Sequence, residues 1–321
     1  MSIQPTTLLA ALSAEAPVSG ADLARRLGVT RAAVWKQIEA LRDLGAPIAA
    51  SAGSGYRLEW PCERLDAEAI RHDLDPAIRR RVHIQTHWQI DSTNTALLRS
   101  AADGALDLSV VLAETQSDGR GRRGRSWQSP LGGNVYFSLL KRFDAAMGAL
   151  AGLSIAAGIA LARTLRETGV DGVGLKWPND LVADGRKVAG ILVELGGEFL
   201  GPCCAVIGIG INVRAPQVKI DQPITDLAAL CGNPPSRNVL VARLIDNLAT
   251  ATDTFARSGF GAFGRDYAEF DALAGKPVRV HTAQDTRDGV AAGVDARGAL
   301  RVRHGAETVV YDSADVSVRA A

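Results

Sequence analysis

The chain has 321 residues, of which 47% are hydrophobic and 22% are charged. This is the composition of a soluble globular protein that can bury a substantial core, and the length leaves room for two or three domains. The formal net charge is only +1, so there is no overall basic field of the kind that attracts nucleic acid or an anionic membrane.

Three short helices and a hairpin are predicted in residues 1–62. Thr6–Ser13 has leucines at helical spacing, and the second helix ends at Gly28. The third helix begins after Thr30, and Ile48–Leu58 alternates around two glycines as a hairpin does. Helix, helix, turn, helix and hairpin is the order of a winged helix-turn-helix domain.

The third helix of this domain would read DNA, and the hairpin would serve as its wing. Residues 1–62 hold six basic against five acidic side chains, which is a net charge of +1. Because phosphate neutralisation dominates affinity for DNA, one copy should bind weakly and a dimer should be required. A helical domain used for protein contacts would show the same order of elements. The candidate DNA contacts are Arg31, Trp35, Lys36, Gln37 and Arg57.

Short apolar strands and helical segments alternate from His83 onward, as in an α+β or mixed-sheet enzyme domain. Ala145–Ala162 carries no charge and is just long enough to cross a membrane. It is rich in Ala and Gly, however, so we expect a helix inside the core and no membrane span. Further helices are expected at Val239–Phe255 and Phe260–Leu273. Strands are expected at Val110–Glu114, Asn134–Leu140, Val173–Trp177, Val188–Leu195 and Cys204–Val213.

A basic loop, Gly119–Trp127, follows the first of these strands and contains three glycines and four arginines. Glycine is costly in helices and strands, and arginine supplies rigid forks of donors that suit carboxylates and phosphates. The loop is therefore predicted to wrap an anion, with an aromatic ring beside it. A solvated loop, or one that binds RNA without sequence preference, would have the same composition.

Four further motifs lie at strand ends and loops. Asp91–Asn94 either caps a helix or binds a polar ligand. Lys176–Asp180 combines a cation, an amide and a carboxylate around a proline, and a plain turn does not explain its lysine and tryptophan. Lys187 precedes an apolar strand, and Gly208–Val213 is a strand whose glycines indicate a close approach to the backbone.

The last residues change to a period of two after Gly275, which predicts short strands, with turn residues at Asp295–Gly298. The cysteines and histidines of the chain show no metal-ligand or redox spacing, so no structural metal is predicted. Without a signal peptide, reduced thiols and a cytoplasmic location are expected. These residues are Cys62, Cys203, Cys204, Cys231, His72, His83, His87, His281 and His304.

The runs Gly-Arg-Gly-Arg-Arg-Gly-Arg, Lys-Trp-Pro-Asn-Asp and Gly-Ile-Leu-Val-Glu, at these intervals, resemble the biotin–protein ligases. With the N-terminal module, nearly the whole chain resembles the bacterial bifunctional biotin ligases and biotin operon repressors. Lipoate ligases are similar in architecture but lack the glycine–arginine loop. The resemblance implies a winged helix-turn-helix domain (1–62), a class II synthetase-like mixed-sheet catalytic domain (63–273) and an SH3-like barrel (274–321).

The resemblance implies two reactions. Biotin and MgATP give biotinyl-5′-AMP and pyrophosphate, and a lysine of biotin carboxyl carrier protein then takes the biotinyl group. Magnesium would be bound mainly through the nucleotide. Operator DNA and a ligand-dependent homodimer, formed through sheet edges near Asn134–Leu140, are the other implied partners. A ligase whose N-terminal domain no longer represses transcription is the alternative.

Site residues follow by resemblance. Lys187 and Arg122 would have the central electrostatic role, Asp180 would orient or deprotonate the acceptor amine, and Lys176 would stabilise the adenylate. The loop Arg214–Pro223 is shorter than in bifunctional relatives and has no aromatic residue, which leaves coupling to dimerisation open. Biotin would contact Ser92, Thr93, Asn94, Gln116, Gly119, Arg120, Arg122, Lys187, Gly190 and Gly208. The nucleotide would contact Arg122, Arg123, Arg125, Trp127, Asn179, Asn212 and Arg319.

Overall fold

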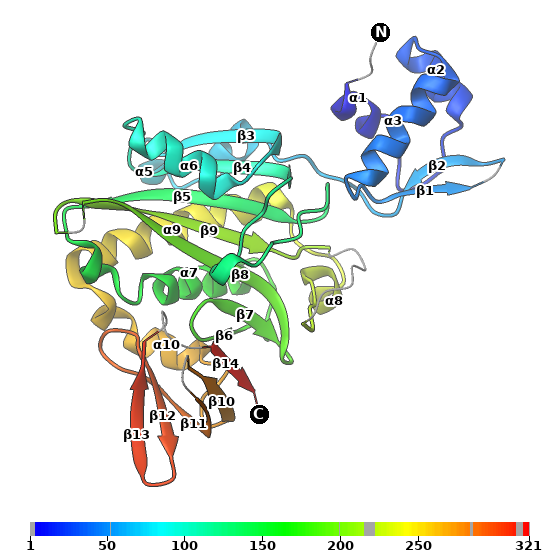
Figure 1. The fold of residues 1–321 in the computed structure, drawn as a ribbon. Coiled ribbons are helices and arrows are strands. Elements are labelled where there is room, and N and C mark those ends of the chain that lie inside the picture. The colour runs from blue at the N-terminus through cyan, green and yellow to red at the C-terminus, as the bar shows by residue number, and fades with distance from the viewer. Residues whose placement is uncertain are drawn as a thin grey trace.

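The computed structural model describes residues 4–51, 53–198, 200–214, 222–282, 285–312 and 317–320, the last range by its backbone only (Figure 1). It consists of a small N-terminal domain, a large central sheet with helices on both faces, and a small C-terminal sheet. The expected α+β architecture is confirmed.

The N-terminal domain has the predicted winged helix-turn-helix order. Ser19 caps the second helix by accepting the Asp22 N–H, and Gly28 ends it in the left-handed conformation with φ 65°. Its third helix buries Val34 and Ile38 completely. The elements are α1 (Pro5–Ala10), α2 (Gly20–Leu27), α3 (Arg31–Asp43), β1 (Ile48–Ser51) and β2 (Gly55–Leu58).

The central sheet has seven strands in the order β3-β4-β5-β9-β8-β7-β6. Strands β3 and β4 are parallel, and the other described pairs are antiparallel, so the sheet is mixed. The strands are β3 (His83–Ile90), β4 (Ser109–Gln116), β5 (Val135–Phe143), β6 (Gly174–Lys176), β7 (Asp180–Ala183), β8 (Arg186–Gly197) and β9 (Cys203–Ile211).

Three expectations for this region need correction. Strand β7 was not among the expected strands. Strand β5 is paired on both sides, so Asn134–Leu140 does not form a sheet edge. The expected helix Phe260–Leu273 is a 3-10 turn, Phe260–Phe263, followed by α10 (Gly264–Phe270). It ends early because Asp271 forms a bridge with Leu175 of β6, which draws the backbone into an extended conformation.

Helices cover the two faces of the sheet unequally. Helices α7 (Leu153–Glu167) and α9 (Arg237–Ser258) pack on one face and form the main core. The stretch Met147–Glu167 is long and apolar enough to cross a membrane, but 67% of its most apolar 18-residue segment is buried inside the protein. It is a core helix. The other face carries α6 (Thr93–Ala102), and the remaining helices are α4 (Ala67–Asp73), α5 (Pro76–Arg79) and α8 (Leu227–Cys231).

The C-terminal strands form one antiparallel sheet in the order β13-β12-β11-β10-β14, as the period of two predicts. Trp177 joins this sheet to the central domain by donating from its indole N–H to the Gly298 carbonyl at 3.0 Å. The strands are β10 (Pro277–His281), β11 (Thr286–Val294), β12 (Leu300–His304), β13 (Glu307–Tyr311) and β14 (Ser317–Ala320).

Candidate active site

The sheet surface is hollow beside the first turn of α6. That helix covers the face formed by Leu140 of β5 and Val206 of β9. Because side chains alternate along a strand, Ser138 and Gly208 lie on the same face, two residues further along, and they are cross-strand partners. Gly190 and Gly210, which are also partners, continue this row of small residues.

The basic loop closes over this hollow. Its two ends meet where the Trp127 N–H donates to the Gly119 carbonyl at 2.7 Å, and the Gly121 N–H donates to the Arg125 carbonyl at 2.7 Å. A Cβ on Gly119 would collide with the Trp127 carbonyl oxygen. Glycine is therefore required at the point where the loop closes, and the loop has a defined conformation.

The indole of Trp127 lies directly on Gly190 and Gly210, which together are called the glycine floor below. A Cβ on Gly210 would overlap its ring, and a Cβ on Gly190 would lie 2.9 Å from the ring and 3.0 Å from the Lys187 ammonium nitrogen. The close approach predicted for Gly210 is thus made by Trp127 of the chain itself, and Lys187 joins Trp127 at Gly190. Lys187 Nζ also lies 5.2 Å from the centre of the ring, which is a cation–π contact.

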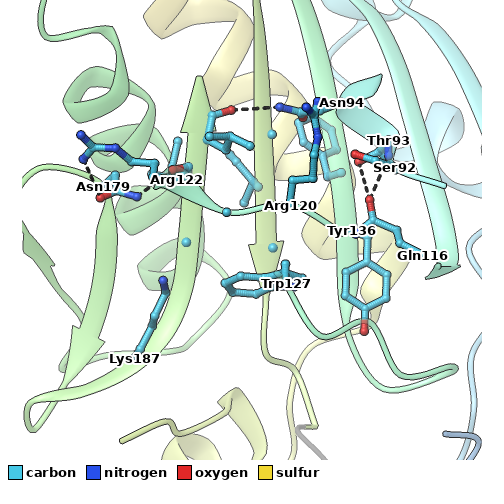
Figure 2. Close-up of a pocket in the computed structure, with 18 residues that line it drawn as sticks. Ser92, Thr93, Asn94, Gln116, Arg120, Arg122, Trp127, Tyr136, Asn179 and Lys187 are labelled. Carbon is cyan, nitrogen blue, oxygen red and sulfur yellow. Dashed lines mark hydrogen bonds between the residues drawn. The ribbon is translucent and has the colours of Figure 1, made fainter. Parts of the chain in front are cut away.

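Loop and sheet enclose a cavity of about 490 Å³, including its open mouth. Figure 2 shows Lys187 and Trp127 along one side, and Ser92, Thr93 and Gln116 at another. The lining residues are Ser92, Thr93, Asn94, Gln116, Arg120, Gly121, Arg122, Trp127, Tyr136, Phe137, Asn179, Lys187, Gly190, Ile191, Leu192, Gly208, Ile209 and Gly210.

One end of the cavity is polar and uncharged. Ser92 caps α6 by accepting the Thr95 N–H at 3.4 Å, and it also lines the cavity. The motif Asp91–Asn94 can therefore cap the helix and contact a polar ligand at the same time. The Gln116 side-chain oxygen accepts the Thr93 N–H at 2.9 Å, and its nitrogen donates to Ser129 at 2.9 Å. These groups are held in place before any ligand binds, as a recognition site for a neutral polar group requires.

The opposite end is cationic. Lys187 Nζ lies 2.7 Å from the Asp180 carboxylate, and Arg122 donates to the Asn179 side-chain oxygen at 3.2 Å. Burial, together with the neighbouring Arg123, lowers the pKa of Arg122 below its ordinary value. Its guanidinium is still charged at neutral pH, because the ordinary pKa of arginine lies far above neutrality. Two partly desolvated cations therefore face one cavity.

A second cavity adjoins the first on the outer side of the loop. Arg123 and Arg125 line this one and not the inner one. Arg120 lines both, and its guanidinium lies 2.8 Å from the Glu194 carboxylate. Arg122 also lines both cavities, so the loop divides its arginines between two adjoining cavities.

Among the predicted active-site residues whose side chains are described, Asp180, Lys176 and Asn212 line neither cavity. Asn212 is 7% exposed and donates to the Lys187 and Thr225 carbonyls, so it holds backbone in place. Lys176 lies on β6, where it is the cross-strand partner of Asp180. The side chain of Arg319 lies outside the described part of the chain, as do residues 215–221 of the short loop.

The predicted DNA contacts lie on the outer surface of the N-terminal domain. Arg31, Lys36 and Arg57 are exposed, and Gln37 is half-buried. The Trp35 side chain is 59% exposed, which is unusual for a large aromatic residue on a helix. Within the described residues, no group of three or more His, Cys, Asp or Glu side chains could hold a metal ion.

Two residues next to the inner cavity, Ser138 and Glu194, are not among the predicted site residues. Ser138 is a serine in an otherwise apolar strand, and it is fully buried. Glu194 ends the Gly-Ile-Leu-Val-Glu run and lies within β8, where it follows the buried part of the strand. A polar residue where the pattern demands an apolar one was the available signal in both cases.

Comparisons with known families agree with this architecture. Residues 87–212 match the Biotin/lipoate A/B protein ligase family, residues 6–57 match an HTH domain, and residues 274–319 match the Biotin protein ligase C terminal domain.

Similar proteins cover the chain from end to end. It is 36% identical to the Bifunctional ligase/repressor BirA of Salmonella typhimurium, over 99% of this chain and 98% of the relative. It is 35% identical to the protein of that name from Escherichia coli, again over 99% and 98%. The structure of the Aquifex aeolicus biotin protein ligase in complex with biotin and ATP aligns with a TM-score of 0.65 at 24% identity, covering 74% of this chain and 99% of that one.

Proposed function

The chain belongs to the BirA family of bifunctional ligase/repressor proteins, and from this premise we propose how its own residues act. It is an ATP-dependent biotin–protein ligase with an N-terminal DNA-binding domain. The observation that carries the residue assignment is the polarity of the cavity, which is neutral and hydrogen-bonding at one end and cationic at the other.

Biotin fits this polarity by its own chemistry. Its uncharged cyclic urea would lie against Ser92, Thr93 and Gln116, and its carboxylate would reach Lys187 and Arg122. A carboxylate and a nucleotide triphosphate repel each other, so the two cations lower the barrier by stabilising the charge that develops between them. The carboxylate oxygen bonds to the α-phosphorus, and the bond to the departing pyrophosphate breaks. The further biotin contacts are Asn94, Gly119, Arg120, Gly190 and Gly208.

The nucleotide would extend toward the loop and Trp127. Arg123 and Arg125, on the outer surface, would contact its phosphates, and Asn179 would contact it beside Arg122. Asn212 would act through the backbone that it supports, and Arg319 completes the proposed set. Mg²⁺ would be held through the phosphates, which suits an ion that retains water and takes few protein ligands.

In the second step the acceptor lysine of biotin carboxyl carrier protein attacks the acyl carbon, and AMP departs with the bonding electrons. Free lysine titrates near ~10.4, so the amine must lose a proton before it attacks. Asp180 lies beside Lys187 and would orient that amine and accept its proton. Lys176, its cross-strand partner, would stabilise the departing phosphate.

We further propose that the N-terminal domain binds operator DNA as a ligand-dependent homodimer in the cytoplasm. The exposed Trp35 and Lys36 on α3 and Arg57 on the wing support this role, because they leave an outward-facing basic surface. The proposed domains are 1–62, 63–273 and 274–321. The alternative, a ligase whose N-terminal domain no longer represses, keeps the same catalytic residues.

Biotin-dependent ATP–pyrophosphate exchange tests the enzyme. Exchange with biotin and none with lipoate is expected, and exchange with lipoate alone would overturn the assignment. Footprinting on the promoter of biotin-synthesis genes, with and without biotin and ATP, tests the repressor. Protection only when both ligands are present supports the dimer, whereas no protection under any condition supports the alternative.

A further inference from the structure

Glu194 joins the first turn of α6 to the basic loop. One of its carboxylate oxygens accepts from the Asn94 side-chain nitrogen at 2.8 Å and from Arg120 at 2.8 Å. Its side chain is 25% exposed, and it does not line the inner cavity. Glu194 lines only the second cavity, so it acts on the inner one through the groups that it holds there.

The carboxylate determines which way the Asn94 amide points. The amide nitrogen donates to Glu194 and to the Leu192 carbonyl at 3.3 Å, so the amide oxygen is turned toward Ser138. An amide oxygen can only accept, and the Ser138 hydroxyl therefore donates to it at 2.6 Å. A Cβ on Gly208 would overlap the Asn94 amide, so the sheet is built to receive it there.

The direction of the next hydrogen bond follows. The Ser138 hydroxyl has one proton, which Asn94 receives, so Ser138 must accept from the Thr93 hydroxyl at 2.8 Å. The Thr93 hydroxyl also lies 3.2 Å from the Gln116 side-chain oxygen. The contact with Ser138 is the shorter of the two and the more deeply buried, with Ser138 fully buried and Thr93 4% exposed, so facing lone pairs would cost more there than toward Gln116. Thr93 is thereby left as an acceptor toward the cavity.

We propose that Glu194 and Ser138 are positioning residues that set the hydrogen-bond polarity of the biotin end of the cavity. Through Asn94 they make Thr93 an acceptor for a urea N–H, and Glu194 also holds Arg120, and with it the basic loop, against β8. This inference rests on the proposed function, because it assigns the urea of biotin to that end.

The first experiment measures ATP–pyrophosphate exchange by the full-length wild type, Glu194→Gln and Ser138→Ala. We expect the KM for biotin to rise about 10-fold in both variants, as for one lost hydrogen bond, with kcat and the KM for ATP within about twofold. The matched control is Glu269→Gln, which removes the exposed carboxylate that pairs with Arg166 at 2.6 Å and should change nothing. An equal loss of kcat in both variants, without a change in KM, would overturn the proposal.

A second readout separates polarity from general damage. Biotin analogues in which either urea N–H is replaced by oxygen remove the donor that Thr93 should accept. Wild type should prefer biotin over both analogues, and the preference over the more strongly rejected analogue is the quantity to compare. Ser138→Ala should reduce this preference about 10-fold, because the Thr93 hydroxyl is then free to rotate and donate a hydrogen bond. A purely structural role would lower activity on biotin and the analogues alike and leave the preference unchanged, which would overturn the proposal.

Trypsin digestion tests whether Glu194 restrains Arg120, and it does not require catalytic turnover by the ligase. Glu194→Gln should be cleaved within residues 120–125 about 10-fold faster than wild type, while Ser138→Ala and Glu269→Gln should match it. Equal cleavage of Glu194→Gln and wild type would overturn this part. A wild type that shows no exchange with biotin would instead refute the proposed function, so the two failures are distinguishable.

Discussion

The ammonium nitrogen of Lys187 lies 2.7 Å from the carboxylate of Asp180, and the two side chains are only 15% and 22% exposed. Lys187 belongs to β8 and Asp180 to the start of β7. Their charges balance inside the protein, and the attraction between them offsets part of the cost of desolvating an ammonium group at the cavity. The pair also links the residue proposed for adenylate formation to the residue proposed for transfer.

Removing the ammonium should mainly affect the first step. For Lys187→Met we expect ATP–pyrophosphate exchange to fall at least about 100-fold, because a desolvated charge at the reacting carboxylate is lost. Lys276→Met removes an exposed lysine and serves as the control. Exchange within twofold of wild type in Lys187→Met would contradict the central role of this residue.

Removing the carboxylate should mainly affect the second step. For Asp180→Ala we expect single-turnover transfer to the carrier protein to slow about 100-fold, because the amine loses its proton acceptor. Adenylate formation should fall less than about 10-fold, since Lys187 keeps its charge and loses only its orientation. Asp171→Ala, an exposed change, is the control. Equal losses in both steps would count against the assignment.

The glycine floor should be sensitive to a single methyl group. In Gly210→Ala the new Cβ would overlap the Trp127 indole and displace the end of the loop. We expect the KM for ATP to rise about 10-fold or more, with the melting temperature little changed, because the ring can move outward. Gly261→Ala places its methyl group in open space and should behave as wild type. An unchanged KM for ATP in Gly210→Ala would show that the Trp127 position is unimportant.

A buried ion pair ties the connection after residue 62 to α9. Arg237 and Glu114 are 2.9 Å apart with side chains 6% and 7% exposed, and Glu114 also accepts the Leu65 N–H at 2.7 Å. Glu114→Gln leaves the arginine charge buried and unpaired, so we expect a loss of about 3 kcal/mol in urea unfolding. Glu307→Gln, which breaks an exposed pair with Arg287, should leave the unfolding midpoint almost unchanged. A similar loss in both variants would argue against the buried pair.

Acid stability should depend on Asp253. Burial would raise the pKa of this carboxyl group, but hydrogen bonds from Arg81 and Lys141 hold the pKa below its ordinary value. A lowered folded-state pKa gives stability that is present above the unfolded value of about 3.9 and is lost as the pH falls through the folded-state pKa. The melting temperature of wild type should therefore exceed that of Asp253→Asn at pH 6, and the difference should shrink below about pH 4. A difference that grows on acidification would contradict this sign.

Much of this protein is determined by local sequence. The capping residues Ser19 and Thr30, the left-handed Gly28 and the period of two after Gly275 act within a few residues of the chain, so their consequences could be predicted without a fold. The motifs that surround the cavity were recognisable for the same reason, because each is a continuous run of residue types suited to one ligand chemistry.

Tertiary structure decided the rest, because it depends on strand register between distant segments. Only the pairing of β8 with β9 places Gly190 opposite Gly210, and so creates the floor on which Trp127 lies. Only the fold brings Glu194 to Asn94 and Arg120, and Asn212 to the backbone beneath Lys187. The residue types were visible in the sequence. Which of them face the cavity, and which hold the others in place, depended on contacts that no local pattern records.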